Sequence, residues 1–479
     1  MNDFAIPYAG GSVRHAACRA AFACMIALAV ALGIGRFAFT PLLPLMLHGG
    51  GLDLQHGGWL ASFNYAGYFV GAVTCAALRA EPARLVRIGL AVTVLLTLAM
   101  GVTSQFWIWA MVRFAAGVVS AWTFVFASQW GLRRLAELGA NEWSGVIYTG
   151  PGAGIVATGL LVSAAGGYGA AAGWLGFGMA AAMLSALVWR GFVASPTSPT
   201  SPTSPTSPTS PAAHASPTSP ASPASHAAHA AHAAQVAPND PNDPTPPDAQ
   251  PPASRHAAAS PGGAASTVAT AAALARTPGD THTQTYRAEA FWLVALYGVP
   301  GFGYIITATF LPVIARHALP PGSPWPDLFW PLFGVALMLG ALGASRLPHH
   351  WDNRSLLAGC YALQAAGVAS SIVWPSVGGF AVGTMLLGLP FTAITLFAMR
   401  EARRLRGDHA AGLMGYATAA YGLGQIVGPL VAAPIAMHTG SFSLALWLAA
   451  GALLLGALGL VALAHVPRRR DARSTQGRE

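Results

Sequence analysis

The chain has 479 residues, of which 54% are hydrophobic and 9% are charged, whereas an ordinary soluble domain carries about 25% charged residues. Every one of its 25 basic residues is arginine. Without lysine the chain has no phosphate-binding P-loop and no Schiff base, so it cannot drive an activity with an ATPase of its own. Cys18, Cys24, Cys75 and Cys360 form no CxxC pair, and they fit small apolar fillers better than a metal site or a disulfide.

Apolar runs of roughly 20 residues, long enough to cross the core of a bilayer, recur along the chain. The first run is too long for the h-region of a cleaved signal peptide, so we expect it to be a retained span. The predicted spans are 20–47, 57–78, 85–103, 106–132, 143–165, 170–193, 290–314, 325–345, 354–374, 377–399, 411–437 and 441–464. This pattern predicts an all-α membrane protein with twelve transmembrane helices.

The arginines predict the orientation of these spans. All except Arg36, Arg113 and Arg316 lie in or beside alternate gaps between the apolar runs. Positive charge resists translocation, so this side is predicted to be cytoplasmic, with both termini inside, in a bacterial inner (plasma) membrane. The net charge of +9 then reflects orientation and an arginine-rich tail beside anionic lipid, and we expect no nucleic-acid partner.

Residues 194–288 differ from the rest of the chain. They begin with a Ser-Pro-Thr repeat of period three and continue rich in alanine, proline and histidine. Such a segment cannot bury a core, so we predict a disordered cytoplasmic linker between an N-terminal bundle (1–193) and a C-terminal bundle (289–479). His226, His229 and His232 recur every third residue, but they lack a rigid scaffold, and we expect no metal site and no cofactor.

The two halves that flank the linker repeat the same residues in the same order. The matching sets are Gly35 and Pro44 with Gly303 and Pro312, the Arg-Arg-Leu triplets at 133–135 and 403–405, and Gly150-Pro151 with Gly428-Pro429. Equivalent spans with equivalent residues predict two homologous six-helix bundles in parallel orientation, an arrangement found in alternating-access carriers.

Five segments resemble one transporter family. They are GIGRFAFTPLLP at 33–44, GWLASFNYAGY at 58–68, GYIITATFLP at 303–312, GLMGY at 412–416 and GQIVGP at 424–429. In these motifs the chain resembles the YbfB/YjiJ-type branch of the major facilitator superfamily (MFS), over about residues 15–465 apart from the linker. The resemblance implies the MFS fold with a central cavity lined mainly by spans one, four, seven and ten, and it leaves the substrate open.

The resemblance also implies gating residues. The superfamily usually carries a Gly-x-x-x-Asp-Arg-x-Gly-Arg loop between spans two and three, whereas here Gly71 leads to Arg79, Glu81 and Arg84 without that aspartate. We still predict that Arg79 and Arg84 serve this gate. Gly150-Pro151 is similar to a glycine–proline element associated with antiporters, and we predict gating roles for Gly150, Pro151, Gly428 and Pro429, because small residues permit close helix approach and proline bends a helix.

Arg36 and Arg113 lie well inside predicted spans, where a charge is costly and normally faces the bundle interior or a wet cavity. Arg113 with Gly117 also resembles an Arg-x-x-x-Gly element that the superfamily uses for substrate or proton handling. The alternative is an arginine that holds helices together through backbone carbonyls. The acidic residues all fall in loops, linker, tails or span edges, so we expect no buried carboxylate. The unmatched positive charge then favours an anionic or carboxylate-bearing solute.

Other polar residues extend the predicted substrate site. Asn64 and Tyr68 are four residues apart in span two, Tyr304 and Thr307 share a face of span seven, and Thr392 lies in span ten. Together with Arg36 and Arg113 they suit a small amphipathic solute, although ordinary interhelical hydrogen bonding would use the same residue types.

These patterns predict a monomeric secondary transporter that exports a small organic solute by alternating access. A drug-type exporter of neutral or cationic amphipathic compounds is the first alternative, and a non-transporting sensor that kept the fold is the second. A membrane-bound enzyme is disfavoured, because no cluster of catalytic groups lies within the spans.

Overall fold

The computed structural model describes residues 8–49, 51–78, 80–164, 167, 169–192, 278–344, 346–348, 351–407 and 410–465, and its regular structure there is helical. Arg79 and most of the predicted linker, including its histidine repeat, lie outside the described residues. In the N-terminal half the helices are α1 (Tyr8–Leu28), α2 (Phe39–His48), α3 (Leu54–Thr74), α4 (Pro82–Val102), α5 (Phe106–Glu137), α6 (Ser144–Ile147), α7 (Gly150–Ala164) and α8 (Ala170–Trp189). In the C-terminal half they are α10 (Pro278–Ala318), α11 (Trp325–Ala344), α12 (Asn353–Val373), α13 (Val377–Gly388), α14 (Phe391–Arg406), α15 (Ala410–Thr439) and α16 (Ser443–His465).

Within the described part of the chain, eleven helical segments are long and apolar enough to cross a membrane. Three of them join consecutive elements: α1 with α2, α6 with α7, and α13 with α14. In lipid every backbone polar group must be bonded within the segment, which is why such runs form helices. The predicted second span corresponds to α3, which has 21 residues but is not among the eleven. Polar residues in α3, such as Gln55, His56 and Asn64, reduce its hydropathy.

Several helices extend beyond the predicted spans. α10 begins at Pro278, inside the predicted linker, and α5 and α14 end at Glu137 and Arg406, past the predicted ends at 132 and 399. Hydropathy marks only the apolar part of a helix, and each of these extensions is polar. The helix boundaries therefore could not be read from apolar runs alone.

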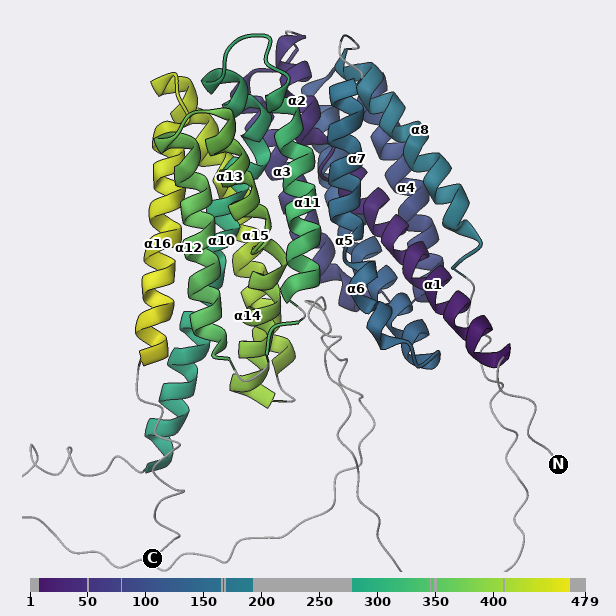
Figure 1. Cartoon of the computed structure of the whole chain (residues 1–479), viewed down its shortest axis with the longest axis vertical. Coiled ribbons are helices and arrows are strands. Elements are labelled where there is room, and N and C mark those ends of the chain that lie inside the picture. Colours follow the sequence, from purple (N-terminus) through teal and green to yellow (C-terminus); the bar gives the residue numbers. More distant parts are fainter. Residues whose placement is uncertain are drawn as a thin grey trace, which may run out of the picture.

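The helices form two bundles that lie side by side (Figure 1). Between the bundles α3 packs along α15, α7 along α11, and α2 against α10. Among the hydrogen bonds that cross this interface, Ser62 Oγ donates to the Ile426 carbonyl at 2.8 Å, and Thr40 Oγ1 donates to the Ala308 carbonyl at 3.2 Å. The interface thus joins α2, α3 and α7 of the first bundle to α10, α15 and α11 of the second.

The same close helix crossing recurs in both bundles. A Cβ placed on Gly67 of α3 would lie 1.9 Å from the Phe114 carbonyl oxygen of α5, and one on Gly340 of α11 would lie 1.9 Å from the Leu389 carbonyl oxygen next to α14. Only glycine lets backbones approach so closely. These equivalent crossings between spans two and four, and between spans eight and ten, agree with the repeat seen in the sequence.

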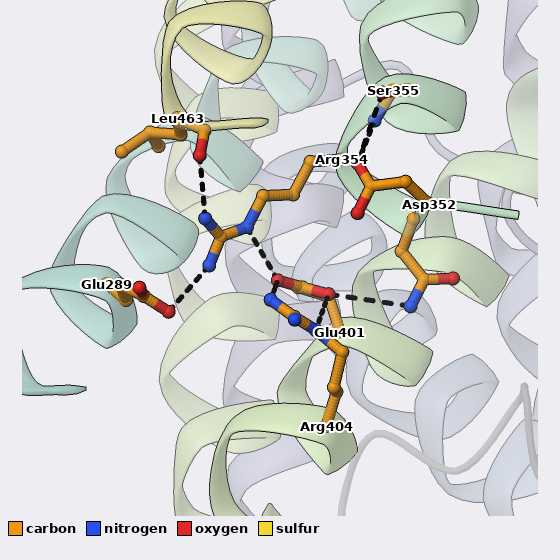
Figure 2. A network of polar contacts seen from close by, with 8 residues as sticks. Glu289, Asp352, Arg354, Ser355, Glu401, Arg404 and Leu463 are labelled. Atoms are coloured by element: carbon orange, nitrogen blue, oxygen red, sulfur yellow. Dashed lines mark hydrogen bonds and ion pairs between the residues drawn. The ribbon is translucent and has the colours of Figure 1, made fainter. Parts of the chain in front are cut away.

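A buried ion-pair cluster ties the C-terminal bundle together (Figure 2). Arg354 of α12 donates from Nε to Glu401 of α14 at 2.7 Å, from Nη2 to Glu289 of α10 at 2.7 Å and from Nη1 to the Leu463 carbonyl of α16 at 2.9 Å. Arg404 Nε donates to Glu401 at 2.7 Å. Glu401 is only 1% exposed, so the expectation that no carboxylate is buried was wrong. It was wrong because α14 continues past the predicted span and three helices close around its end.

Candidate functional site

The first span is interrupted at the centre of the N-terminal bundle. α1 passes into a π-helix at Ala29–Ile34, the chain turns through residues 35–38, and α2 begins at Phe39. In the turn the Thr40 N–H bonds to the Phe37 carbonyl at 3.2 Å, where a regular helix would use Arg36. Pro41 and Pro44 have no N–H to donate. Local π-helical geometry of this kind is frequent at functional sites.

Arg113 of α5 stabilises this interruption. Its Nη2 donates to the Arg36 carbonyl at 3.1 Å and its Nη1 to the Gly35 carbonyl at 3.4 Å. The guanidinium also lies 4.7 Å from the centre of the Phe39 ring, and the residue is only 2% exposed. Asn64 Nδ2 of α3 in turn donates to the Arg113 carbonyl at 2.8 Å. These contacts favour a positioning role for Arg113 and Asn64 over direct contact with a solute.

Arg36 is the other buried arginine, at 5% exposure. Its Nη2 donates to Gln425 Oε1 of α15 at 3.0 Å, and Gln425 donates from Nε2 to the Tyr304 hydroxyl of α10. The guanidinium carbon lies 4.0 Å from the centre of the Tyr68 ring. Its Nε is buried without a hydrogen-bond partner in the protein, and none of the ion pairs among the described residues involves Arg36. A positive charge with aromatic and amide neighbours but no carboxylate therefore lies between the two bundles.

Stacked aromatic rings continue the site into the C-terminal bundle. Tyr421 stacks on Tyr304 with ring centres 5.9 Å apart and on Tyr297 at 5.1 Å. Phe391 meets Tyr304 edge-on at 5.0 Å. The Tyr297 hydroxyl donates to Thr395 at 3.1 Å. These rings present an apolar, polarizable wall beside the Arg36 guanidinium.

Two threonines that the sequence predicted as site residues have hydroxyl groups without a hydrogen-bond partner in the protein. Thr307 lies one turn beyond Tyr304 on α10, and Thr392 follows Phe391 on α14. The Oγ1 atoms of both are buried and have no hydrogen-bond partner in the protein. A buried hydroxyl without a partner is costly unless something else satisfies it, so these two groups fit a site completed by a bound molecule.

Two of the six predicted gating residues, Gly150 and Gly428, lie at close helix contacts. A Cβ on Gly150 of α7 would lie 2.3 Å from the Met25 carbonyl oxygen of α1, and one on Gly428 of α15 would lie 2.3 Å from the Ile305 side chain of α10. Pro151 lies in the first turn of α7 and Pro429 lies inside α15. Equivalent glycines thus bring spans five and eleven against spans one and seven. Arg84 is exposed near the start of α4, away from these contacts.

Residues missed as site candidates include Gln425, Tyr65 and Tyr421. Gln425 carries a polar amide in an otherwise apolar stretch of α15, and it is 4% exposed. A polar side chain inside a predicted span was therefore the signal that could have marked it as a site residue. The Tyr65 ring lies 5.2 Å from Arg36, and its hydroxyl pairs with Thr309 Oγ1 of α10 at 2.9 Å. Both contacts join residues far apart in sequence, which a periodicity within one helix cannot reveal.

Comparison with known proteins identifies the family. Residues 28–221 and 263–461 match the family described as "Uncharacterised MFS-type transporter YbfB". No curated protein matches the chain. The crystal structure of nucleoside transporter NupG has a TM-score of 0.61 at 10% identity, over 94% of this chain and 100% of that chain. A mutant form of NupG gives 0.61 at 10% identity, over 92% and 99%. At such low identity this likeness shows the fold alone. The chain is therefore a multi-pass membrane protein that belongs to the YbfB family of MFS-type transporters.

Proposed function

We propose that this protein is a secondary carrier that moves a small organic anion, favoured to be a carboxylate, by alternating access between its two bundles. The observation that carries the proposal is Arg36, a buried cation at the bundle interface with no carboxylate partner among the described residues. Arginine binds carboxylates through paired, charge-assisted hydrogen bonds. A substrate carboxylate would supply the missing counter-ion and the acceptor for Nε.

The rest of the site supports a solute with both apolar and polar parts. The Tyr304 and Tyr421 rings offer stacking surface, and the unpartnered hydroxyls of Thr307 and Thr392 offer hydrogen bonds. Sites for small molecules combine mainly apolar walls with a few placed polar groups. We place Arg36, Tyr68, Tyr304, Thr307 and Thr392 in direct contact with the solute, and Arg113 and Asn64 behind them.

The topology we propose has twelve spans, with α3 as the twelfth crossing element, and both termini in the cytoplasm of a bacterial cell. α3 packs between α5 and α15, and its polar residues Ser62 and Asn64 are buried against protein. The arginine distribution supports the orientation. Export is the proposed direction, supported by the glycine–proline element at Gly150-Pro151.

A neutral or cationic aromatic solute is the second candidate, favoured by the stacked Tyr297, Tyr421 and Tyr304 rings. Aromatic faces bind planar rings and cations without needing an arginine. The structural neighbours are nucleoside transporters by name, so nucleosides belong in any ligand screen beside lipophilic cations.

The ligand class can be tested by thermal shift on purified protein, with carboxylates, amino acids, sugars, nucleosides and lipophilic cations. A ligand at 100 times its dissociation constant adds about 2.7 kcal/mol to the stability of the folded state. We expect carboxylates to raise the melting temperature of the wild type and of Arg403→Gln, an exposed-site control, but not of Arg36→Gln.

The opposite pattern of ligand stabilisation would contradict the proposal. If only cations or neutral rings stabilise the protein, and Arg36→Gln responds as the wild type does, the drug-type exporter becomes the better account. Counterflow in proteoliposomes then separates carrier from sensor, because a sensor that kept the fold binds its ligand without exchanging it across the bilayer.

A further inference from the structure

A groove opens on the outer side of the N-terminal bundle between α4 and α8, which run antiparallel. At one end the two helices are in close contact: a Cβ on Gly178 would lie 2.4 Å from the Leu98 side chain, and one on Gly101 would lie 2.9 Å from Leu175. At the other end Ile88 of α4 and Trp189 of α8 both line a cavity. This is the end at which α4 begins and α8 finishes.

Two open cavities lie between α4 and α8 at this end. One has a volume of about 470 Å³ and the other about 550 Å³, and they share Ala91 and Trp189 in their walls. Alanines, valines, Leu95 and Ile88 form most of the lining. Leu95 is 65% exposed and Ile88 is 48% exposed. The groove is thus a shallow, largely apolar hollow that is open to the surroundings of the bundle.

Three arginines surround the wide end of this groove. Arg84 and Arg87 of α4 line the first cavity with Glu81, and Arg190 at the end of α8 lines the second. None of the ion pairs among the described residues involves these arginines. The Nε of Arg87 is buried without a hydrogen-bond partner in the protein. With one carboxylate against three guanidinium groups, the rim favours an anion.

A polar group inside the groove also lacks a partner. Ser185 lines the second cavity, is 5% exposed, and its Oγ has no hydrogen-bond partner in the protein. It lies on α8 between the arginine rim and the narrow, apolar end. A ligand that fills the groove would therefore meet a charged rim, then a hydroxyl donor, and then an apolar wall.

We infer that this groove is a binding site for an anionic phospholipid of the phosphatidylglycerol type. The phosphate contacts Arg84, Arg87 and Arg190, an ester carbonyl accepts a hydrogen bond from Ser185, and an acyl chain lies along Ala91 and Leu95. Basic pockets between transmembrane helices recognise lipid headgroups in this way. Lipid is the occupant because α8 lies at the outer edge of the molecule, on the side of the first bundle away from the second (Figure 1), and the helices that pack against α4 and α8 all belong to the first bundle.

Native mass spectrometry of the full chain with phosphatidylglycerol or phosphatidylcholine tests this site. Near a membrane surface each arginine strengthens binding of an anionic headgroup by about fivefold. We expect the wild type to retain phosphatidylglycerol in preference to phosphatidylcholine. The variant Arg84→Ala/Arg87→Ala/Arg190→Ala should bind phosphatidylglycerol about 100-fold more weakly, and Ala91→Phe, which fills the groove and keeps every charge, should bind it more weakly too.

The control variant Arg400→Ala/Arg403→Ala/Arg406→Ala removes the same formal charge from α14, and it should retain phosphatidylglycerol as the wild type does. Equal retention of the two lipids by the wild type would overturn the inference. So would loss of phosphatidylglycerol in the α14 control to the same extent, which would indicate attraction by net charge. Unchanged retention in Ala91→Phe would show that the groove does not hold the acyl chain.

Discussion

Arg354→Ala is expected to lower the free energy of unfolding by about 3 kcal/mol, the lower end of the range for breaking a buried ion pair. The variant leaves Glu401, which is 1% exposed, and Glu289 without their shared partner. Arg404 still pairs with Glu401, which is why we expect the lower end. The loss should appear as a reduced melting temperature of purified protein and as a smaller monodisperse fraction.

Arg403→Ala is the matched control, because Arg403 is exposed on the same helix as Glu401. It should change stability by no more than about 0.5 kcal/mol. A double variant, Arg354→Met with Glu401→Gln, should recover part of the loss, since it removes the uncompensated charge as well as the pair. If Arg354→Ala melts at the wild-type temperature, the cluster in Figure 2 does not hold the bundle together.

Arg113→Ala should destabilise the protein by about 3 kcal/mol or more, because hydrogen bonds to a charged group contribute about 1.5–3 kcal/mol each and this variant loses two of them. The lost bonds are those to the Gly35 and Arg36 carbonyls. In the interrupted first span neither carbonyl accepts the usual helical hydrogen bond from the N–H four residues later. Transport should fail as well, since the Arg36 backbone would lose its support. Melting temperature and counterflow together measure both effects.

Arg113→Lys separates charge from geometry. A lysine keeps the positive charge but offers a point donor in place of the planar fork that reaches two carbonyls, so we expect an intermediate melting temperature. If Arg113→Ala instead keeps the wild-type melting temperature and loses only ligand affinity, Arg113 contacts the solute, as the sequence motif indicated, and the positioning role is wrong.

The fold was predictable because lipid imposes one strong requirement. Apolar runs must become helices, and the repeated glycines and prolines marked equivalent spans before any contact was known. The helix extension from Pro278 was not predictable, because a polar continuation of a helix has no hydropathy signal. Burial of Glu401 was also missed, because it depends on contacts with other helices around the end of α14, which hydropathy along one segment does not reveal.

The candidate site was predictable residue by residue but not as an arrangement. Arg36, Tyr68 and Tyr304 stood out as polar or aromatic groups inside apolar spans. The bond from Arg36 to Gln425 joins residues on opposite halves of the chain, and helical periodicity says nothing about such distances. The different roles of Arg36 and Arg113 became visible only from the packing of the helices. The Arg113 guanidinium contacts backbone carbonyls, whereas the Arg36 guanidinium contacts an amide and a tyrosine ring.

The central claim is that Arg36 binds the negative charge of the solute. The most direct test compares the affinity of the best carboxylate ligand with that of its methyl ester, by calorimetry, in the wild type and in Arg36→Gln. A hydrogen bond to a charged group corresponds to about a 10- to 100-fold difference in affinity. We predict that the wild type binds the carboxylate more tightly than the ester by this factor, and that Arg36→Gln binds the two with near-equal affinity. The same preference in both proteins would contradict the account, because the carboxylate would then be bound elsewhere.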